Sequence, residues 1–74
     1  MERREVHTTH NPGGSGWVNE IDGRIVSRHR SRFVAEMEGR RLATERSAEH
    51  VIHGENGDVR QRILYSIDPK SMRE

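Results

Sequence analysis

Five short segments of the chain alternate apolar or β-branched residues with polar ones, as half-buried strands do. These segments are residues 5–10, 17–21, 24–29, 48–54 and 58–63. Asp22-Gly23 separates the second segment from the third, and Asn56-Gly57 separates the last two. Both dipeptides are typical of tight two-residue hairpin turns. Between the two hairpins, Ser31 is placed to cap a helix over residues 32–46.

The order strand, strand, strand, helix, strand, strand predicts an α+β fold. We expect an antiparallel sheet of four to five strands, built from two hairpins, with one helix packed on one face. The 74 residues form a single small domain over 1–74, with frayed ends at 1–4 and 70–74. A domain of this size removes only about 60% of its unfolded surface from water, so a homodimer is one way to enlarge the core.

Small side chains mark one face of the predicted helix. At 100° per residue, a single stripe collects Ala35, Gly39, Leu42 and Ala43. Such a helix can lie close to a sheet, and close packing is the best reason for a glycine in mid-helix. We expect Trp17 to fill the space that the small side chains leave.

Phe33 and Met37 fall on the opposite side of the helix and are i,i+4 neighbours. Two interpretations stay open for them. They form an exposed apolar pair that contacts a partner or a second copy, or Phe33 folds back over the edge of the core.

The turn positions also assign the two faces of the sheet. A two-residue turn pairs Ile21 with Arg24 and Asn19 with Val26, and the second hairpin pairs Ile52 with Gln61. The face predicted to meet the helix carries Trp17, Asn19, Ile21, Val26, Ile52, Val59 and Ile63. The opposite face carries Val18, Glu20, Ile25, Ser27, Val51, His53, Arg60 and Arg62. Aliphatic residues mixed with arginine are typical of an interaction surface, and a solvated face is the alternative.

The overall charge of the chain argues against a nucleic-acid-binding protein. The 13 basic residues, all arginine except Lys70, are nearly balanced by 12 acidic ones. Arginine binds phosphate well, but a GC-rich genome also favours its codons. The densest positive cluster comprises Arg24, Arg28, Arg30 and Arg32, and it leads into the helix N-terminus, which attracts anions. Few aromatic residues are available to stack on bases.

No residue pattern supports catalysis or a bound cofactor. The sequence has no cysteine and no apolar run near the roughly 20 residues of a membrane helix, so we expect a cytoplasmic protein. His7 and His10 are three residues apart, as are His50 and His53. An odd spacing on a strand sends side chains to opposite faces, so neither pair can chelate a metal. We expect no enzyme activity, no cofactor and no metal.

Several motifs together resemble a known family. They are "GWV", an Asp-Gly turn, "AEMEGRRLA", "HVIHGENGDVR" and "YSIDP". From about residue 13 to 69 this layout resembles the small bacterial and phage proteins catalogued as domain of unknown function number 2188. The chain has Gly39 where that pattern usually has Ala, and Asn19 and His50 where apolar residues are more usual. The resemblance implies a compact α+β domain and no activity.

The layout is also loosely similar to small phage-encoded anti-CRISPR proteins. We therefore expect a non-enzymatic protein-binding module, an inhibitor from a phage or mobile element that docks sterically on a host nucleoprotein complex. The alternative is a weak nucleic-acid-binding protein that uses Arg24, Arg28, Arg30 and Arg32. The residues expected to contact a protein partner are Val18, Ile25, Val51, His53, Arg60, Arg62, Phe33 and Met37.

Overall fold

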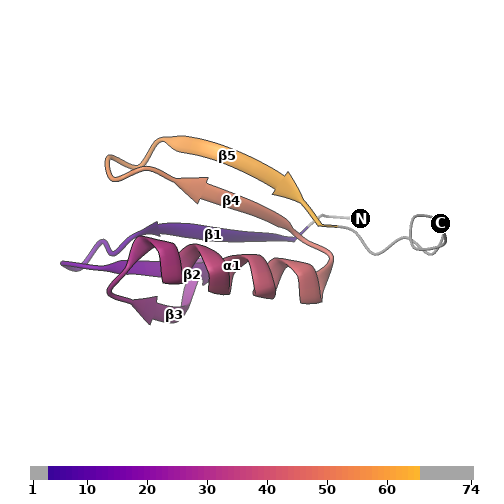
Figure 1. The fold of residues 1–74 in the computed structure, drawn as a ribbon, viewed down its shortest axis with the longest axis horizontal. Coiled ribbons are helices and arrows are strands. Elements are labelled where there is room, and N and C mark those ends of the chain that lie inside the picture. Colours follow the sequence, from indigo (N-terminus) through magenta and orange to yellow (C-terminus); the bar gives the residue numbers. More distant parts are fainter. Residues whose placement is uncertain (1–3, 66–74) are drawn as a thin grey trace, which may run out of the picture.

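The computed structural model describes residues 4–65, which form five strands and one helix (Figure 1). In chain order the elements are β1 (Glu5–His10), β2 (Trp17–Ile21), β3 (Arg24–His29), α1 (Arg32–Arg46), β4 (Glu49–His53) and β5 (Val59–Leu64). The predicted order, the helix bounds and the α+β class are confirmed. The predicted fraying of residues 1–4 and 70–74 falls almost wholly outside the described residues.

The sheet is mixed rather than wholly antiparallel. Its strand order is β3-β2-β1-β4-β5, and β1 runs parallel to β4 while the other neighbours are antiparallel. The difference arises because α1 carries the chain from the edge strand β3 back across the sheet to the free side of β1. The two hairpins therefore lie on either side of the central strand β1.

Local signals in the sequence end the elements where predicted. The side chain of Ser31 accepts a hydrogen bond from the Val34 amide at 3.3 Å, which caps α1. At the other end Ser47 takes the left-handed conformation, with φ 52°. Asp22 and Gly23 both have positive φ, which fits a two-residue turn whose twist matches the flanking strands.

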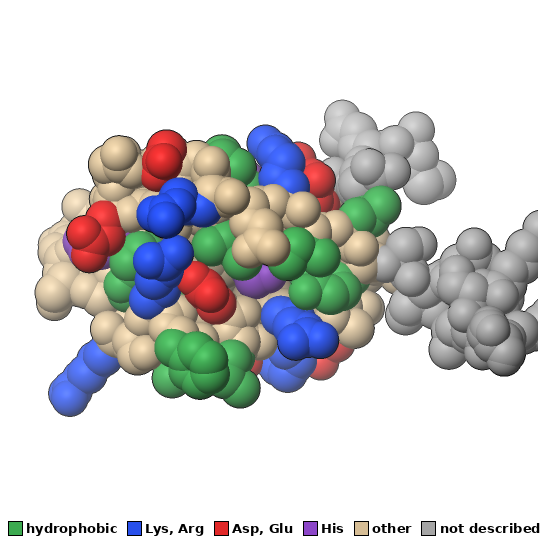
Figure 2. Space-filling view, turned by 45° about the horizontal axis from the view of Figure 1, so that its top comes forward, with side chains coloured by type: hydrophobic (Ala, Val, Ile, Leu, Met, Phe, Trp, Pro, Cys, Tyr) green, Lys and Arg blue, Asp and Glu red, His purple; other side chains and the backbone are tan. Residues whose placement is uncertain are grey.

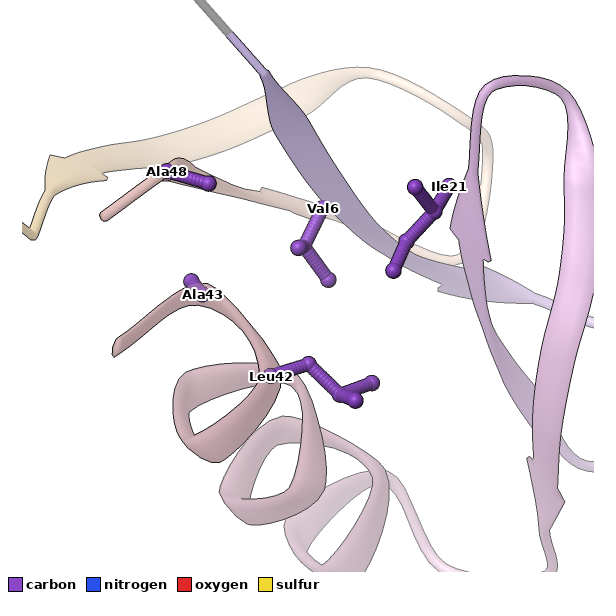
Figure 3. Packing of buried hydrophobic residues seen from close by; sticks show 5 residues of the cluster. All are labelled: Val6, Ile21, Leu42, Ala43 and Ala48. Atoms are coloured by element: carbon purple, nitrogen blue, oxygen red, sulfur yellow. The ribbon is translucent and has the colours of Figure 1, made fainter. Parts of the chain in front are cut away.

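The hydrophobic core is small and lies between α1 and the sheet. Leu42 and Ala43 point from the helix toward Val6 on β1 and Ile21 on β2, with Ala48 beside them (Figure 3). The helix packs mainly on β1, β2, β3 and β4, and β5 lies beyond its principal contacts (Figure 1). The one helix layer therefore leaves part of its side of the sheet uncovered.

A buried polar network lies at the centre of the helix–sheet interface. Thr8, Asn19 and His50 come from β1, β2 and β4, and all three are buried. The Thr8 hydroxyl donates to Asn19 Oδ1 at 2.5 Å and accepts the proton of His50 Nε2 at 2.6 Å. The Asn19 amide donates to the Ala35 carbonyl of α1 at 2.9 Å, which ties the network to the helix. We call these three residues the Thr8–Asn19–His50 network.

Gly39 lies directly against this network. A Cβ added at Gly39 would stand 2.5 Å from His50 Nε2 and 2.6 Å from Asn19 Oδ1. The prediction that Gly39 serves close packing is confirmed, but the prediction that Trp17 fills the space is wrong. The Trp17 ring instead lies beside His10 and within 5.4 Å of the Arg32 guanidinium.

A register shift in the first hairpin corrects part of the predicted core. Ile21 pairs with Arg24 as predicted, but the register shifts beside Asn19, which pairs with Ser27 instead of Val26. Ser27 therefore faces the helix side and accepts a hydrogen bond from Asn19. Val26 is 49% exposed and is not a core residue.

A similar shift occurs in the second hairpin. Ile52 pairs with Gln61 as predicted, but His53 pairs with Val59 after a register shift. Val59 is therefore 47% exposed rather than buried, and Ile63 is only partly buried. An extra residue in one strand turns the side chains beyond it to the opposite face of the sheet. The residues left out of the pairing, Val26 and Arg60, are not glycines.

We expect Gly39→Ala to lower the free energy of unfolding by about 1–3 kcal/mol, because the added methyl group overpacks the network. Helix propensity alone would give the opposite sign, a gain of about 1 kcal/mol. Urea denaturation followed by circular dichroism measures the change. Arg40→Ala, on the exposed neighbouring position, is the control and should stay within about 0.5 kcal/mol. A stabilised Gly39→Ala protein would contradict the described contact.

Acid should weaken the fold through His50. Burial lowers the pKa of His50 below its ordinary value of 6.5, an effect that the charge of Glu36 opposes and that of His7 reinforces. The unfolded chain then binds more protons than the folded one below about pH 6.5, so stability falls as the pH drops. We expect His50→Gln, which keeps an N–H donor but does not titrate, to flatten the pH dependence of the unfolding midpoint between about pH 7 and 5. An unchanged slope, equal to that of a His10→Gln control, would contradict the assignment.

Candidate functional site

A groove opens between α1 and the β4–β5 hairpin. Its volume is about 230 Å³. The groove is lined by Phe33, Glu36, Met37, Arg40, His50, Ile52, Gln61, Ile63 and Tyr65. Figure 2 shows hydrophobic side chains gathered around a small area of histidine that is just visible between them, with arginine and carboxylate groups nearby. We call this feature the helix–sheet groove.

The dimensions of the two layers explain why the groove exists. Neighbouring strands lie about 4.8 Å apart, so five strands span about 19 Å between the outer strand axes, whereas a helix is only about 10 Å wide. With α1 packed mainly over the other four strands, the helix-facing side of β5 remains open. Ile63 and Tyr65 of this hairpin then face the flank of α1 across the groove.

Phe33 and Met37 form the helical wall of the groove. Phe33 is 69% exposed and Met37 is 57% exposed. The interpretation that they are an exposed apolar pair is confirmed, and the alternative that Phe33 folds back over the core is wrong. What the sequence did not reveal is that Ile63 and Tyr65 stand opposite them, because that depends on which strand follows β4 at the sheet edge.

The polar groups of the groove are few. His50 lies at the inner side of the groove, and its Nε2 proton is held by Thr8. At the rim, Glu36 forms an ion pair with Arg32 at 2.8 Å, and Arg40 lies exposed one turn further along α1. An apolar lining with a few fixed polar groups is suited to binding an apolar side chain and orienting it.

The opposite face of the sheet, the open face, offers less contact surface than predicted. Val18 and Val51 are completely buried, so the prediction that they contact a partner from an exposed position is wrong. Val18 on β2 and Val51 on β4 each lie on a strand that has a neighbouring strand on both sides. Ile25 and His53 are partly buried.

Arg60 and Arg62 do not share a surface as predicted. Arg62 lies on the open face and forms ion pairs with Glu49 at 3.1 Å and Glu5 at 3.7 Å. Arg60 follows the register shift in β5, and its side chain lies close to Gly54 and lines a hollow with Arg32 at the start of α1. The shift turns Arg60 toward the helix side of the molecule.

The four arginines of the nucleic-acid alternative are also divided. Arg28 and Arg30 line one hollow with the loop residues Ser15 and Gly16. Arg24 lies at the opposite end of β3 and lines another hollow with Arg4 and Arg46. Arg32 is held by Glu36 and by the Trp17 ring. A continuous positive stripe, which tracking a phosphate backbone requires, is not formed by these four side chains.

The open face brings two histidines together from strands far apart in the sequence. His7 Nδ1 lies 2.8 Å from His53 Nε2, and His7 Nε2 lies 2.8 Å from the carboxylate of Glu5. His10 and His50 point to the other face, as strand alternation predicts. No pattern in the sequence indicates the contact between His7 and His53, because the contact depends on the parallel pairing of β1 with β4. Among residues 4–65, no group of three or more potential ligands could hold a metal ion.

A family model described as "Uncharacterized protein conserved in bacteria (DUF2188)" matches residues 6–65, which is all but two of the described positions. The chain belongs to the DUF2188 family. The resemblance seen in the sequence is thereby confirmed. No curated protein and no solved structure matches this DUF2188 chain. Within the described residues, no helix has the length and apolar character needed to cross a membrane.

The exposure of Phe33 and Met37 predicts how their substitution changes the free energy of unfolding. We expect Phe33→Ser and Met37→Ser each to change the free energy of unfolding by less than about 1 kcal/mol, because most of each side chain is already in water. Leu42→Ala, which empties a core position on the same helix, should cost about 2–5 kcal/mol. Thermal unfolding of the three variants makes the comparison. A large loss for either serine variant would place that residue in the core.

Proposed function

We propose that this domain is a non-enzymatic protein-binding module whose helix–sheet groove accepts the apolar face of an amphipathic helix from another protein. The observation that carries the proposal is the exposed pair Phe33 and Met37, which faces the uncovered side of β5 across a shallow apolar groove. Phenylalanine and methionine are enriched at protein interfaces. Large apolar side chains gathered in one place on a small domain mark an interaction site.

The shape of the open space favours a helix as the occupant. A second helix lying beside α1 would complete the layer that one helix cannot supply for a five-stranded sheet. Recognition of this kind places apolar residues of the incoming helix, spaced three or four apart, into a hydrophobic groove. Arg40 and Glu36 at the rim can pair with charges on the polar side of such a helix.

The helix–sheet groove is favoured over the surfaces predicted from the sequence. On the open face, Val18 and Val51 are covered and Arg62 is already paired with two carboxylates. The arginines of the nucleic-acid alternative lie in separate hollows. The narrower prediction, a phage or mobile-element inhibitor that docks on a host nucleoprotein complex, stays a prediction.

Photo-crosslinking tests the groove directly. With a photoreactive amino acid at Met37, we expect cross-links to a peptide of another protein that is helical and carries apolar residues at three- and four-residue spacing. Phe33→Asp should reduce the yield at least about tenfold, because a desolvated charge in an apolar contact costs several kcal/mol. Mass spectrometry of nuclease-treated lysate identifies the peptide.

Val34→Asp is the matched control. Val34 is 47% exposed on the same helix turn but does not line the groove, so this variant should keep the cross-link. Equal loss with both aspartate variants would contradict the groove as the binding site. Cross-links only to a second copy of this chain, or only to nucleic acid, would contradict a partner helix as the occupant.

A further inference from the structure

A chain of three polar contacts crosses the open face of the sheet. It runs from the Glu5 carboxylate to His7 Nε2, from His7 Nδ1 to His53 Nε2, and from His53 Nδ1 to the carbonyl of Gly57. The distances are 2.8 Å, 2.8 Å and 3.2 Å in that order. These three contacts link β1 to β4 and to the turn between β4 and β5.

The acceptors at the two ends of this series of contacts determine where the ring protons of His7 and His53 lie. A carboxylate and a carbonyl can only accept, so both end contacts are hydrogen bonds only when His7 carries a proton on Nε2 and His53 carries one on Nδ1. If both rings were neutral, the facing nitrogens would then present two lone pairs to each other at 2.8 Å. Two lone pairs at that distance repel unless a positive species lies between them.

We propose that His7 and His53 bind one shared proton between their facing nitrogens, so that the two rings together carry a single positive charge. A separation of 2.8 Å is that of an N–H···N hydrogen bond. Two imidazoles on a tetrahedral zinc ion, with bonds of about 2.0–2.1 Å, would place their nitrogens about 3.3 Å apart. The geometry therefore favours a proton over a metal ion.

The charges around the pair suit a cation. On β1, Glu5 contacts His7 directly, and on β2, Glu20 stands opposite His7 in the sheet. Glu49 on β4 and Arg62 on β5 form an ion pair at the same end of the open face as Glu5. In the turn, Glu55 and Asp58 line the hollow with Arg32 and Arg60 on the helix side, and Arg28 lies on β3 beyond β2. Among these groups, the Glu5 carboxylate is the one that contacts a ring of the pair.

The shared proton ties the turn over residues 54–58 to β1 in a pH-dependent way. While the proton is present, β1 holds His53, and His53 in turn holds the Gly57 carbonyl. When the proton leaves at higher pH, the one proton left on His53 can serve only one of its two contacts, so either the tie to β1 or the tie to the Gly57 carbonyl is lost. The turn over residues 54–58 then keeps its own backbone hydrogen bonds, such as that from the Gly54 amide to the Asp58 carbonyl at 2.8 Å, but β1 no longer holds it. This inference concerns the face opposite the helix–sheet groove and goes beyond the proposed function.

Nitrogen-15 NMR of the full chain can detect the shared proton. At about pH 6 we expect one ring proton to couple to both His7 Nδ1 and His53 Nε2, and this signal should vanish by about pH 9. Over the same range, amide hydrogen exchange in residues 54–58 should accelerate about tenfold beyond its intrinsic pH dependence. His7→Gln should abolish both effects, whereas His10→Gln, on the other face of β1, should leave both unchanged.

Two results would overturn the shared proton. One is a His53 ring whose pH response is the same with and without His7→Gln. The other is stoichiometric binding of Zn²⁺ at about pH 7 that perturbs both rings together, because the site would then take a metal ion. Glu5→Gln is a second variant that keeps both rings, and it serves if His7→Gln does not fold. It should lower the pH at which the shared signal is lost.

Discussion

The parallel pairing of β1 with β4 is the constraint on which the rest of this structure depends. It places Thr8 beside His50 on the helix side and His7 beside His53 on the open face. It also sets β5 at the sheet edge, where the helix does not reach. The contact between Thr8 and His50, the histidine pair and the position of β5 beside the helix–sheet groove therefore all follow from one strand alignment. The remaining bond of the buried network, between Thr8 and Asn19, comes from the antiparallel pairing of β1 with β2.

Gly39, Asn19 and His50 form one structural feature together with Thr8. The side chains of Thr8, Asn19 and His50 meet against Gly39 at one point of the helix–sheet interface. These polar side chains occupy the space where a methyl group would stand, and the absence of Cβ at position 39 makes that space available. An alanine at position 39 would clash with them, whereas with glycine the three polar groups satisfy their hydrogen bonds inside the protein.

The sequence was sufficient for features that depend on neighbours along the chain. Asp22-Gly23, Ser31 and the small-residue stripe of α1 each act within a few positions, and each lies where predicted. The sequence was insufficient for features that depend on pairing between strands that are distant along the chain. Strand alternation places Val18 and Val51 on the correct face, but it does not predict that both are completely buried. Val26 and Arg60 were misplaced by register shifts, since a strand's alternation carries no mark of an inserted residue. The exposed Phe33 and Met37 were the one part of the candidate site that helical periodicity alone could identify.

Charges on both faces of the sheet affect the pKa of His50 on β4. His50 and His53 lie on the same strand with opposite orientations, one beside the groove and the other on the open face. Burial is the main cause of the lowered pKa of His50, and the charge of Glu36 at the groove rim opposes it while that of His7 on the far face adds to it. His50 is only 1% exposed, so a helix seated in the groove would act on it mainly through charges brought near Glu36. Charge on the open face and charge at the groove rim therefore act on the same buried imidazole, because the sheet between them is one residue thick.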